Sequence, residues 1–214
     1  MGVKDKYYYD QKSADRVINF IERICKHSKG PLAGKNFILA KWQRELINEL
    51  FGWKETKTNY RKYRTCYLEI PRKNGKSTLA SALALYLTFA DGEKGAEVYT
   101  VAGDKEQAKI IFNQCRQMCL DSEVLKTNSE IFKDSITYKA SVLKAISADS
   151  DTAHGTNSSA VLFDELHVQK SRDLVDILTT STGARTQPLV ILITTAGWNK
   201  NSVCYEFHKH AKKV

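Results

Sequence analysis

A short basic loop between an apolar run and a helix-forming run constrains this chain most strongly. The apolar run is Cys66–Ile70, and the loop is Pro71–Thr78. The run that follows, Leu79–Leu87, is rich in strong helix formers. This order predicts a strand, a tight loop and a helix. Because the loop contains Gly-Lys-Ser, the last part of a phosphate-binding loop, it predicts an anion site at the start of the helix.

Each residue type in this loop suits phosphate. Gly75 lets the backbone approach the anion closely, and the first N–H groups of the helix point at it. Lys76 can reach the terminal phosphates, and the Ser77 hydroxyl can bind Mg²⁺. The usual pattern also needs a glycine where Ile70 stands, so an exposed basic turn is the competing interpretation. A second motif is needed to decide between them.

The second motif is a buried strand that ends in two acids. Ala160–Phe163 is a fully apolar run, and Asp164 and Glu165 follow it directly. An Asp at the carboxyl end of a central strand is where the metal of a bound nucleotide would lie, and the Glu beside it can polarise an attacking water. An ordinary polar turn is the alternative for this motif alone. The two motifs together predict nucleotide hydrolysis.

Composition and charge narrow the class of protein. The chain has 214 residues, 42% hydrophobic and 27% charged, which suits one soluble domain or a domain with a small appendage. No apolar run approaches the roughly 20 residues of a membrane helix, and the start lacks the apolar core of a signal peptide, so we expect a cytosolic protein. The net charge of +9 favours an anionic partner, with nucleic acid first. Part of the excess lies in Lys54–Arg64 and His208–Lys213.

Five cysteines, at positions 25, 66, 115, 119 and 204, are expected to be buried free thiols. Cys115 and Cys119 could share a helix face. No nearby His or Cys completes a zinc set with them, so metal binding is the weaker alternative.

The remaining pattern alternates helices and strands. We expect helices at Ser13–Lys29, at Lys41–Phe51, from an Asp104 cap to about Leu120, from a Ser171 cap to Thr180, and from Ser202 onward. Further strands are expected at Val98–Ala102 and Leu189–Ile193, with short strands, as in a hairpin, between 131 and 146. This order predicts an α/β fold of the P-loop NTPase type. Its mostly parallel sheet has helices on both faces and both motif strands central.

Two further pairs of residues are candidates with open alternatives. Trp42 and Gln43 could stack on and read an adenine ring, but residue chemistry alone favours Trp42 in the core and Gln43 in solvent. Thr194 and Thr195 follow a buried strand, where their hydroxyls could sense a γ-phosphate or bond to its attacking water. They could equally be β-branched strand residues.

Taken together, these blocks resemble the N-terminal ATPase domain of the large terminase subunit of tailed bacteriophages, a DNA-packaging motor. The resemblance runs from about Lys41 to Trp198 and is carried by Pro71–Ser77, Val101–Ala108, His154-Gly155, Leu162–His167 and Thr194–Gly197. The first block resembles that family's deviant phosphate loop, which lacks the first glycine. This accounts for Ile70.

The resemblance implies a role for each candidate residue. Catalysis would use Glu165 to activate water, with Lys76 and Arg72 supplying charge. Asp164 and Ser77 would serve the Mg²⁺ ion, while Thr194 and Thr195 would couple nucleotide state to movement. ATP would be bound by Trp42, Gln43, Arg72, Lys73, Asn74, Gly75, Lys76, Ser77 and Thr78.

It also implies partners and a division of the chain. The partners would be double-stranded DNA, the portal protein and the small terminase subunit, in the host cytoplasm and away from membranes. The chain would form a ring on the portal, with a monomer in solution as the alternative. Residues 1–52 would form a helical extension and residues 53–214 the ATPase core.

Two features depart from the family pattern. No Arg lies between Arg116 and Arg172, and His154 occupies the approximate place of a trans-acting arginine, which therefore stays unassigned. The family's nuclease domain would not fit in this chain, so we expect no DNA cleavage by it. Two alternatives remain open: a helicase-like DNA-dependent ATPase, and a nucleotide-binding assembly module with little turnover.

Overall fold

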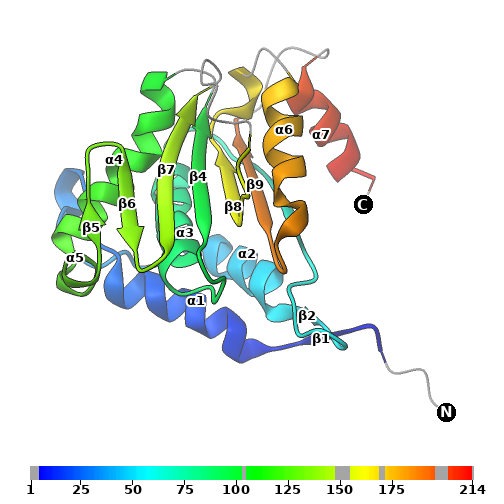
Figure 1. Cartoon of the computed structure of the whole chain (residues 1–214), viewed down its shortest axis with the longest axis horizontal. Helices are drawn as coiled ribbons and strands as arrows, with labels where there is room; N and C mark the ends of the chain where they lie inside the picture. Colours follow the sequence, from blue (N-terminus) through cyan, green and yellow to red (C-terminus); the bar gives the residue numbers. More distant parts are fainter. Residues whose placement is uncertain (1–4, 103–104, 148–154, 169–171, 196–201, 214) are drawn as a thin grey trace.

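The main element of the fold is a seven-stranded sheet with helices on both faces (Figure 1). The computed structural model describes residues 5–102, 105–147, 155–168, 172–195 and 202–213. Across the sheet the strands are β3 (Thr65–Glu69), β9 (Leu189–Thr194), β8 (Ala160–Phe163), β4 (Glu97–Ala102), β7 (Ser141–Ser147), β6 (Ser135–Tyr138) and β5 (Glu130–Ile131). The predicted α/β class is confirmed.

The sheet is parallel from β3 to β7 and antiparallel beyond it. β9 pairs in parallel with both β3 and β8, and β4 pairs in parallel with both β8 and β7. β6 pairs antiparallel with β7 and with β5, so the predicted hairpin between 131 and 146 is confirmed. The carboxyl ends of β3, β9 and β8 therefore lie side by side at the same end of the sheet.

The central position expected for both motif strands is correct for β8 and wrong for β3. β8 is buried along its whole length, with neighbours on both sides. β3 pairs with β9 on one side, and within the described ranges no strand pairs with its other edge. The ends of β3, Thr65 and Glu69, are exposed, which is the mixed pattern of an edge strand.

Two helical layers cover the sheet. α1 (Gln11–Ile24), α2 (Lys41–Gly52), α3 (Lys76–Phe89) and α4 (Lys105–Asp121) share one core with one face of the sheet. α6 (Asp173–Thr180) and α7 (Val203–Ala211) share a second core with the opposite face. Residues alternate between the two cores along the strands: Leu162 joins the first core, and Val161 and Phe163 join the second.

Shorter elements complete the chain. β1 (Tyr7–Tyr9) pairs antiparallel with β2 (Trp53–Glu55), and α5 (Glu123–Asn128) follows α4. Short 3₁₀ segments are η1 (Gly30–Leu32), η3 (Leu166–Val168) and η4 (Ser181–Ala184). In the part of the chain that the structure describes, no helix has both the length and the apolar character that crossing a bilayer requires.

The helix caps differ in part from expectation. The first helix begins after Asp10, whose carboxylate accepts the Lys12 N–H and the Ser13 hydroxyl, so Ser13 supports the cap instead of forming it. This helix ends at Ile24, before the predicted Lys29. The last helix, expected from Ser202 onward, is α7, and Ser202 is its N-cap, with a side chain that accepts the Tyr205 N–H. The expected caps Asp104 and Ser171 lie outside the described residues.

All five cysteines are buried free thiols, as the sequence predicts. Burial raises the pKa of Cys66 and of Cys119 to about 12, so both thiols stay protonated at neutral pH. Their role is therefore packing.

Candidate nucleotide site

The loop 71–78 leaves β3 at the carboxyl edge of the sheet and runs directly into α3. Gly75 forms the N-cap of this helix with φ +76°, and Lys73 has φ +67°. The amide of Asn74 lies 3.3 Å from the Pro71 carbonyl and 3.4 Å from that of Arg72, which helps to hold the turn. Two left-handed residues thus aim the first N–H groups of α3 at the space above the loop, where an anion would bind.

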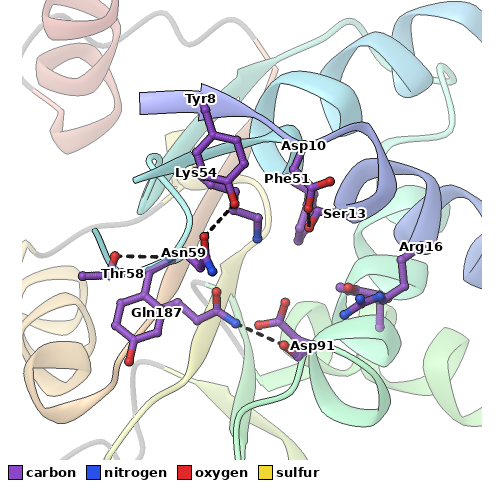
Figure 2. Close-up of a pocket in the computed structure, with 12 residues that line it drawn as sticks. Tyr8, Asp10, Ser13, Arg16, Phe51, Lys54, Thr58, Asn59, Asp91 and Gln187 are labelled. Atoms are coloured by element: carbon purple, nitrogen blue, oxygen red, sulfur yellow. Dashed lines mark hydrogen bonds between the residues drawn. The ribbon is translucent and has the colours of Figure 1, made fainter. Parts of the chain in front are cut away.

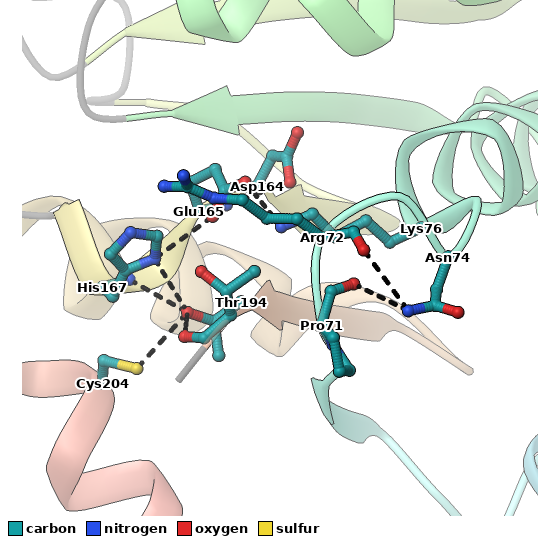
Figure 3. Close-up of polar contacts among 10 residues, drawn as sticks. Pro71, Arg72, Asn74, Lys76, Asp164, Glu165, His167, Thr194 and Cys204 are labelled. Atoms are coloured by element: carbon teal, nitrogen blue, oxygen red, sulfur yellow. Dashed lines mark hydrogen bonds and ion pairs between the residues drawn. The ribbon is translucent and has the colours of Figure 1, made fainter. Parts of the chain in front are cut away.

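The two sequence motifs meet in space (Figure 3). The Lys76 ammonium lies 2.5 Å from Glu165 Oε1, although 89 residues separate them in the chain. The side chain of Lys76 is 8% exposed and that of Glu165 is 23% exposed. Glu165 has φ +51°, a conformation that costs free energy for a residue with a Cβ atom. Such strain is typical of functional positions.

Asp164 lies beside this pair at the end of β8 and is only 6% exposed. Its Oδ1 accepts the Glu165 N–H at 3.0 Å. Burial, followed by the charge of Glu165, raises the pKa of Asp164. A divalent cation would offset the repulsion between these two acids. Carboxylate and hydroxyl oxygens are ligands that Mg²⁺ prefers, so Asp164 and the half-buried Ser77 suit such an ion chemically.

Thr194, at the end of β9, is fully buried next to this site. Its hydroxyl donates to the Thr195 carbonyl at 2.8 Å and contacts His167 Nδ1 at 3.1 Å. The Cys204 sulfur on α7 lies 3.6 Å from the same oxygen. Thr195 is also buried, at 9% exposure. Both threonines thus lie at the strand end that adjoins the acid pair, and Thr194 makes polar contacts beyond those of a strand residue.

The structure agrees with the packing alternative for Trp42 but not for Gln43. Trp42 is half-buried and packs against the first core, as the packing alternative expected. The solvent position expected for Gln43 is wrong, because it is 3% exposed and its Oε1 accepts the Ala40 N–H at 2.9 Å. Its amide nitrogen lies 3.5 Å from where a Cβ on Gly75 would be. Gln43 therefore sits directly against the phosphate-type loop.

The other loop residues differ in exposure. Arg72, Lys73 and Asn74 are exposed, and Figure 3 shows the Arg72 side chain pointing from the loop toward the strand end that carries Glu165. Thr78 is half-buried and accepts a hydrogen bond from the Gln114 amide on α4 at 2.9 Å. The loop thus presents exposed cations in front and fixes its helical end against α4.

Comparison with known proteins decides the family. The model of the family described as terminase large subunit, ATPase domain, matches residues 41–213. This chain belongs to that family. The match begins at the first residue of α2 and includes the phosphate-type loop, the acid pair and both threonines. The family resemblance inferred from the sequence is confirmed.

Individual relatives agree with this assignment. The large terminase subunit of Enterobacteria phage HK97 is 31% identical over 192 residues, covering 86% of this chain and 37% of that protein. The terminase large subunit of Lactococcus phage p2 is 27% identical over 175 residues, covering 77% of this chain and 32% of that protein. The chain thus spans about a third of the length of the curated terminase subunits it matches.

Solved structures show the same fold. The crystal structure of the HK97 large terminase superimposes with a TM-score of 0.80 at 26% identity, covering 94% of this chain and 41% of that one. The large terminase ATPase domain of Thermus phage P74-26 gives a TM-score of 0.54 at 23% identity, covering 67% of this chain and 63% of that one. The second likeness supports the fold alone.

The structure of this terminase ATPase domain adds residues that the sequence did not single out. His167 contacts both Glu165 and Thr194, and Gln114 holds Thr78. The spacing Asp164-Glu165-Leu166-His167 was a visible signal for His167, because it places a polar ring one turn after the acids. For Gln114 the sequence gives no signal. Parts of three blocks of the resemblance, at 103–104, 154 and 196–197, lie outside the described residues.

A cavity of about 320 Å³ lies at the opposite end of the strands (Figure 2). It is lined in part by Tyr8 of β1, Arg16 of α1, Lys54 of β2, Asp91 after α3 and Gln187 before β9. Burial lowers the pKa of Lys54 there. None of the candidate residues named above lines this cavity. The proposed chemistry of this terminase domain therefore rests on the carboxyl ends of β3, β8 and β9 instead.

Proposed function

We propose that this chain hydrolyses ATP with Mg²⁺ and that hydrolysis drives double-stranded DNA into a viral procapsid. The observation that carries the proposal is the contact between Lys76 and Glu165 beside the buried Asp164. The basic loop and the carboxylate strand, which were recognised separately in the sequence, are in contact, and this contact supports a shared site. Membership in the terminase large subunit ATPase family supports ATP as the nucleotide.

The phosphate-type loop would bind the nucleotide's phosphates. Lys76 and the first N–H groups of α3 would hold them, and Arg72 would add positive charge from the exposed side of the loop. Lys73, Asn74, Gly75 and Thr78 would shape or line the same cradle. Mg²⁺, held by Ser77 and Asp164, would neutralise charge on the phosphoryl group. Catalysis would consist mainly of positioning and charge neutralisation.

Glu165 would act as the general base that orients the attacking water. In this structure its carboxylate is engaged by Lys76. Bound phosphates would compete for the Lys76 ammonium and release Glu165 toward the water. The pair would therefore keep the base occupied until nucleotide arrives.

The remaining candidates surround this centre. Gln43 lies against Gly75, where its amide and the adjacent Trp42 ring would contact the adenine. Thr194 and Thr195 would sense the state of the γ-phosphate and pass it to the rest of the motor. Residues 1–52 would act as a helical extension that carries the adenine contacts, and residues 53–214 would form the ATPase core.

The partners follow from the same proposal. The positive net charge suits the DNA backbone, so DNA binding should weaken steeply with salt. The chain would work in the host cytoplasm as a ring on the portal protein together with the small terminase subunit. The expected absence of DNA cleavage stays a prediction, and cuts in a metal-dependent nicking assay would contradict it.

The test is Mg²⁺-dependent ATP hydrolysis by the native chain, Lys76→Ala and Glu165→Gln, at rising protein concentration with and without duplex DNA. Turnover by the native chain, with ATP binding but no turnover in Glu165→Gln, supports the proposal. A rate that climbs faster than concentration would indicate a residue supplied by a neighbouring subunit.

Two outcomes would redirect the proposal. Binding of ATP without turnover at any concentration would favour the assembly module. DNA-stimulated turnover with unwinding, and no packaging into procapsids when portal is present, would favour the helicase-like ATPase.

A further inference from the structure

The loop after β8 carries a histidine to which neither the sequence motifs nor the comparisons give a role. His167 lies in η3, two residues after Glu165, and is 21% exposed. Its Nδ1 atom lies 3.2 Å from Glu165 Oε2 and 3.1 Å from Thr194 Oγ1. One ring nitrogen thus faces both the proposed base and the proposed coupling residue.

The surrounding hydrogen-bonding groups favour one tautomer of the His167 ring. Thr194 donates its own hydroxyl proton to the Thr195 carbonyl, so its oxygen can only accept from the ring. A Glu165 carboxylate oxygen can also only accept. Both neighbours of Nδ1 are then acceptors, and we infer the tautomer that carries its proton on Nδ1. The backbone N–H of His167 donates to the same Thr194 oxygen at 3.3 Å, which fixes the backbone that carries the ring.

The two oxygens of Glu165 have different partners. Oε1 is bonded to Lys76. Oε2 is buried and, among the described residues, has no aligned hydrogen-bond donor, with His167 Nδ1 at ion-pair distance. When phosphates draw Lys76 away, the imidazole becomes the group that retains the carboxylate. A small rotation would turn the 3.2 Å contact into a full hydrogen bond.

We propose that His167 is a positioning residue that holds Glu165 in its water-activating orientation and ties that orientation to Thr194. The inference rests on the proposed ATP hydrolysis. His167 would hold Oε2 and leave Oε1 for the water, so movement of Thr194 at the end of β9 would move the base directly. If the imidazole only fastened η3 to β9, its contact with Thr194 would be enough, and its contact with Glu165 would have no role.

The first test compares three substitutions in the ATPase assay. Asn places an amide N–H close to the position of Nδ1, whereas Gln places it near Nε2. His167→Ala and His167→Gln should lower kcat by about ten- to a hundredfold through lost orientation, with the KM for ATP unchanged. His167→Asn should retain most of the rate. The matched control is His208→Asn on α7, whose imidazole contacts Glu69 at 2.8 Å and should leave kcat unchanged.

The second test reads the proton directly and needs no turnover. Long-range ¹H–¹⁵N spectra of the native chain should show His167 protonated at Nδ1, and Thr194→Val should perturb this signal. An unprotonated Nδ1 overturns the inference whatever the rates. If the native chain turns over ATP and the three His167 variants all have the same kcat as one another, the inference about His167 is also overturned. The proposed function then stands. Absence of native turnover, by contrast, is the failure of the proposed function.

Discussion

Replacing Glu165 by Gln should tighten nucleotide binding, because the native Lys76–Glu165 pair competes with the phosphates for one ammonium group. The pair is short, at 2.5 Å, and mostly buried, so solvent screens it little. The Gln amide oxygen can still accept a hydrogen bond from the charged Lys76 ammonium, so the substitution removes only the charge–charge part of the pair. That part is about 1–1.5 kcal/mol of competition, between the ~0.2–1 kcal/mol of an exposed ion pair and the ~3–5 kcal/mol cost of breaking a fully buried one.

That difference corresponds to a Kd lower by about five- to twelvefold. The assay is calorimetric titration with a non-hydrolysable ATP analogue and Mg²⁺. Glu123→Gln, an equal charge change on the distant helix α5, should leave Kd unchanged.

A second substitution distinguishes the effect of the Lys76–Glu165 pair from the general repulsion between the Glu165 charge and the phosphates. In a Lys76→Met chain the competing ammonium is gone, so adding Glu165→Gln should tighten binding by much less. Equal tightening in both backgrounds would refute the reasoning, because it would show that Glu165 acts only through its charge. Unchanged or weaker binding in Glu165→Gln alone would refute it as well.

Three further outcomes are expected. Arg61→Ala should destabilise the chain by about 3–5 kcal/mol, because it leaves the buried Asp91 unpaired; the two side chains are 1% and 5% exposed. Urea unfolding measures the loss, and a loss under about 1 kcal/mol would contradict the prediction. Asp164→Asn should raise the Tm near pH 7 without Mg²⁺. Since the raised pKa of Asp164 makes its ionised form the destabilising one, the gain should shrink as pH falls toward 4, and a gain that grows instead would reverse the sign argument. Gly75→Ala should lower the free energy of unfolding by about 1–2 kcal/mol and weaken nucleotide binding. There is room for a Cβ atom, but the backbone φ of +76° is unfavourable for alanine. Native-like melting and binding would show that the loop tolerates a Cβ atom there.

Much of the fold could be predicted because its signals are local. Ala160–Phe163 is apolar at every position and is buried at every position. The helix formers after Gly75 give α3 as expected. Both motifs therefore lay at the junctions where the sequence placed them. Where several residues compete for one local role, prediction was weaker: Asp10 caps α1 in place of Ser13, since its carboxylate accepts two hydrogen bonds.

The candidate site was predictable in its residue types and less so in its contacts. A Gln next to a Trp at a helix start gives no sign that the amide will be buried against Gly75. The same holds for Gln114, which reaches Thr78 only because α4 packs on α3. Such contacts depend on how helices dock, and single-residue chemistry does not encode docking.

The sequence by itself determined the strand–loop–helix at Pro71–Thr78 and the apolar strand before Asp164, because each depends on neighbours in the chain. The class of chemistry that we propose follows from these two motifs. Only the tertiary structure decided the strand order, with β3 at the edge and β9 between it and β8. It also decided that Lys76 meets Glu165 and that His167 meets Thr194. These contacts join segments far apart in sequence, and they are selected by sheet pairing and by the packing of two helical layers, which no local pattern specifies.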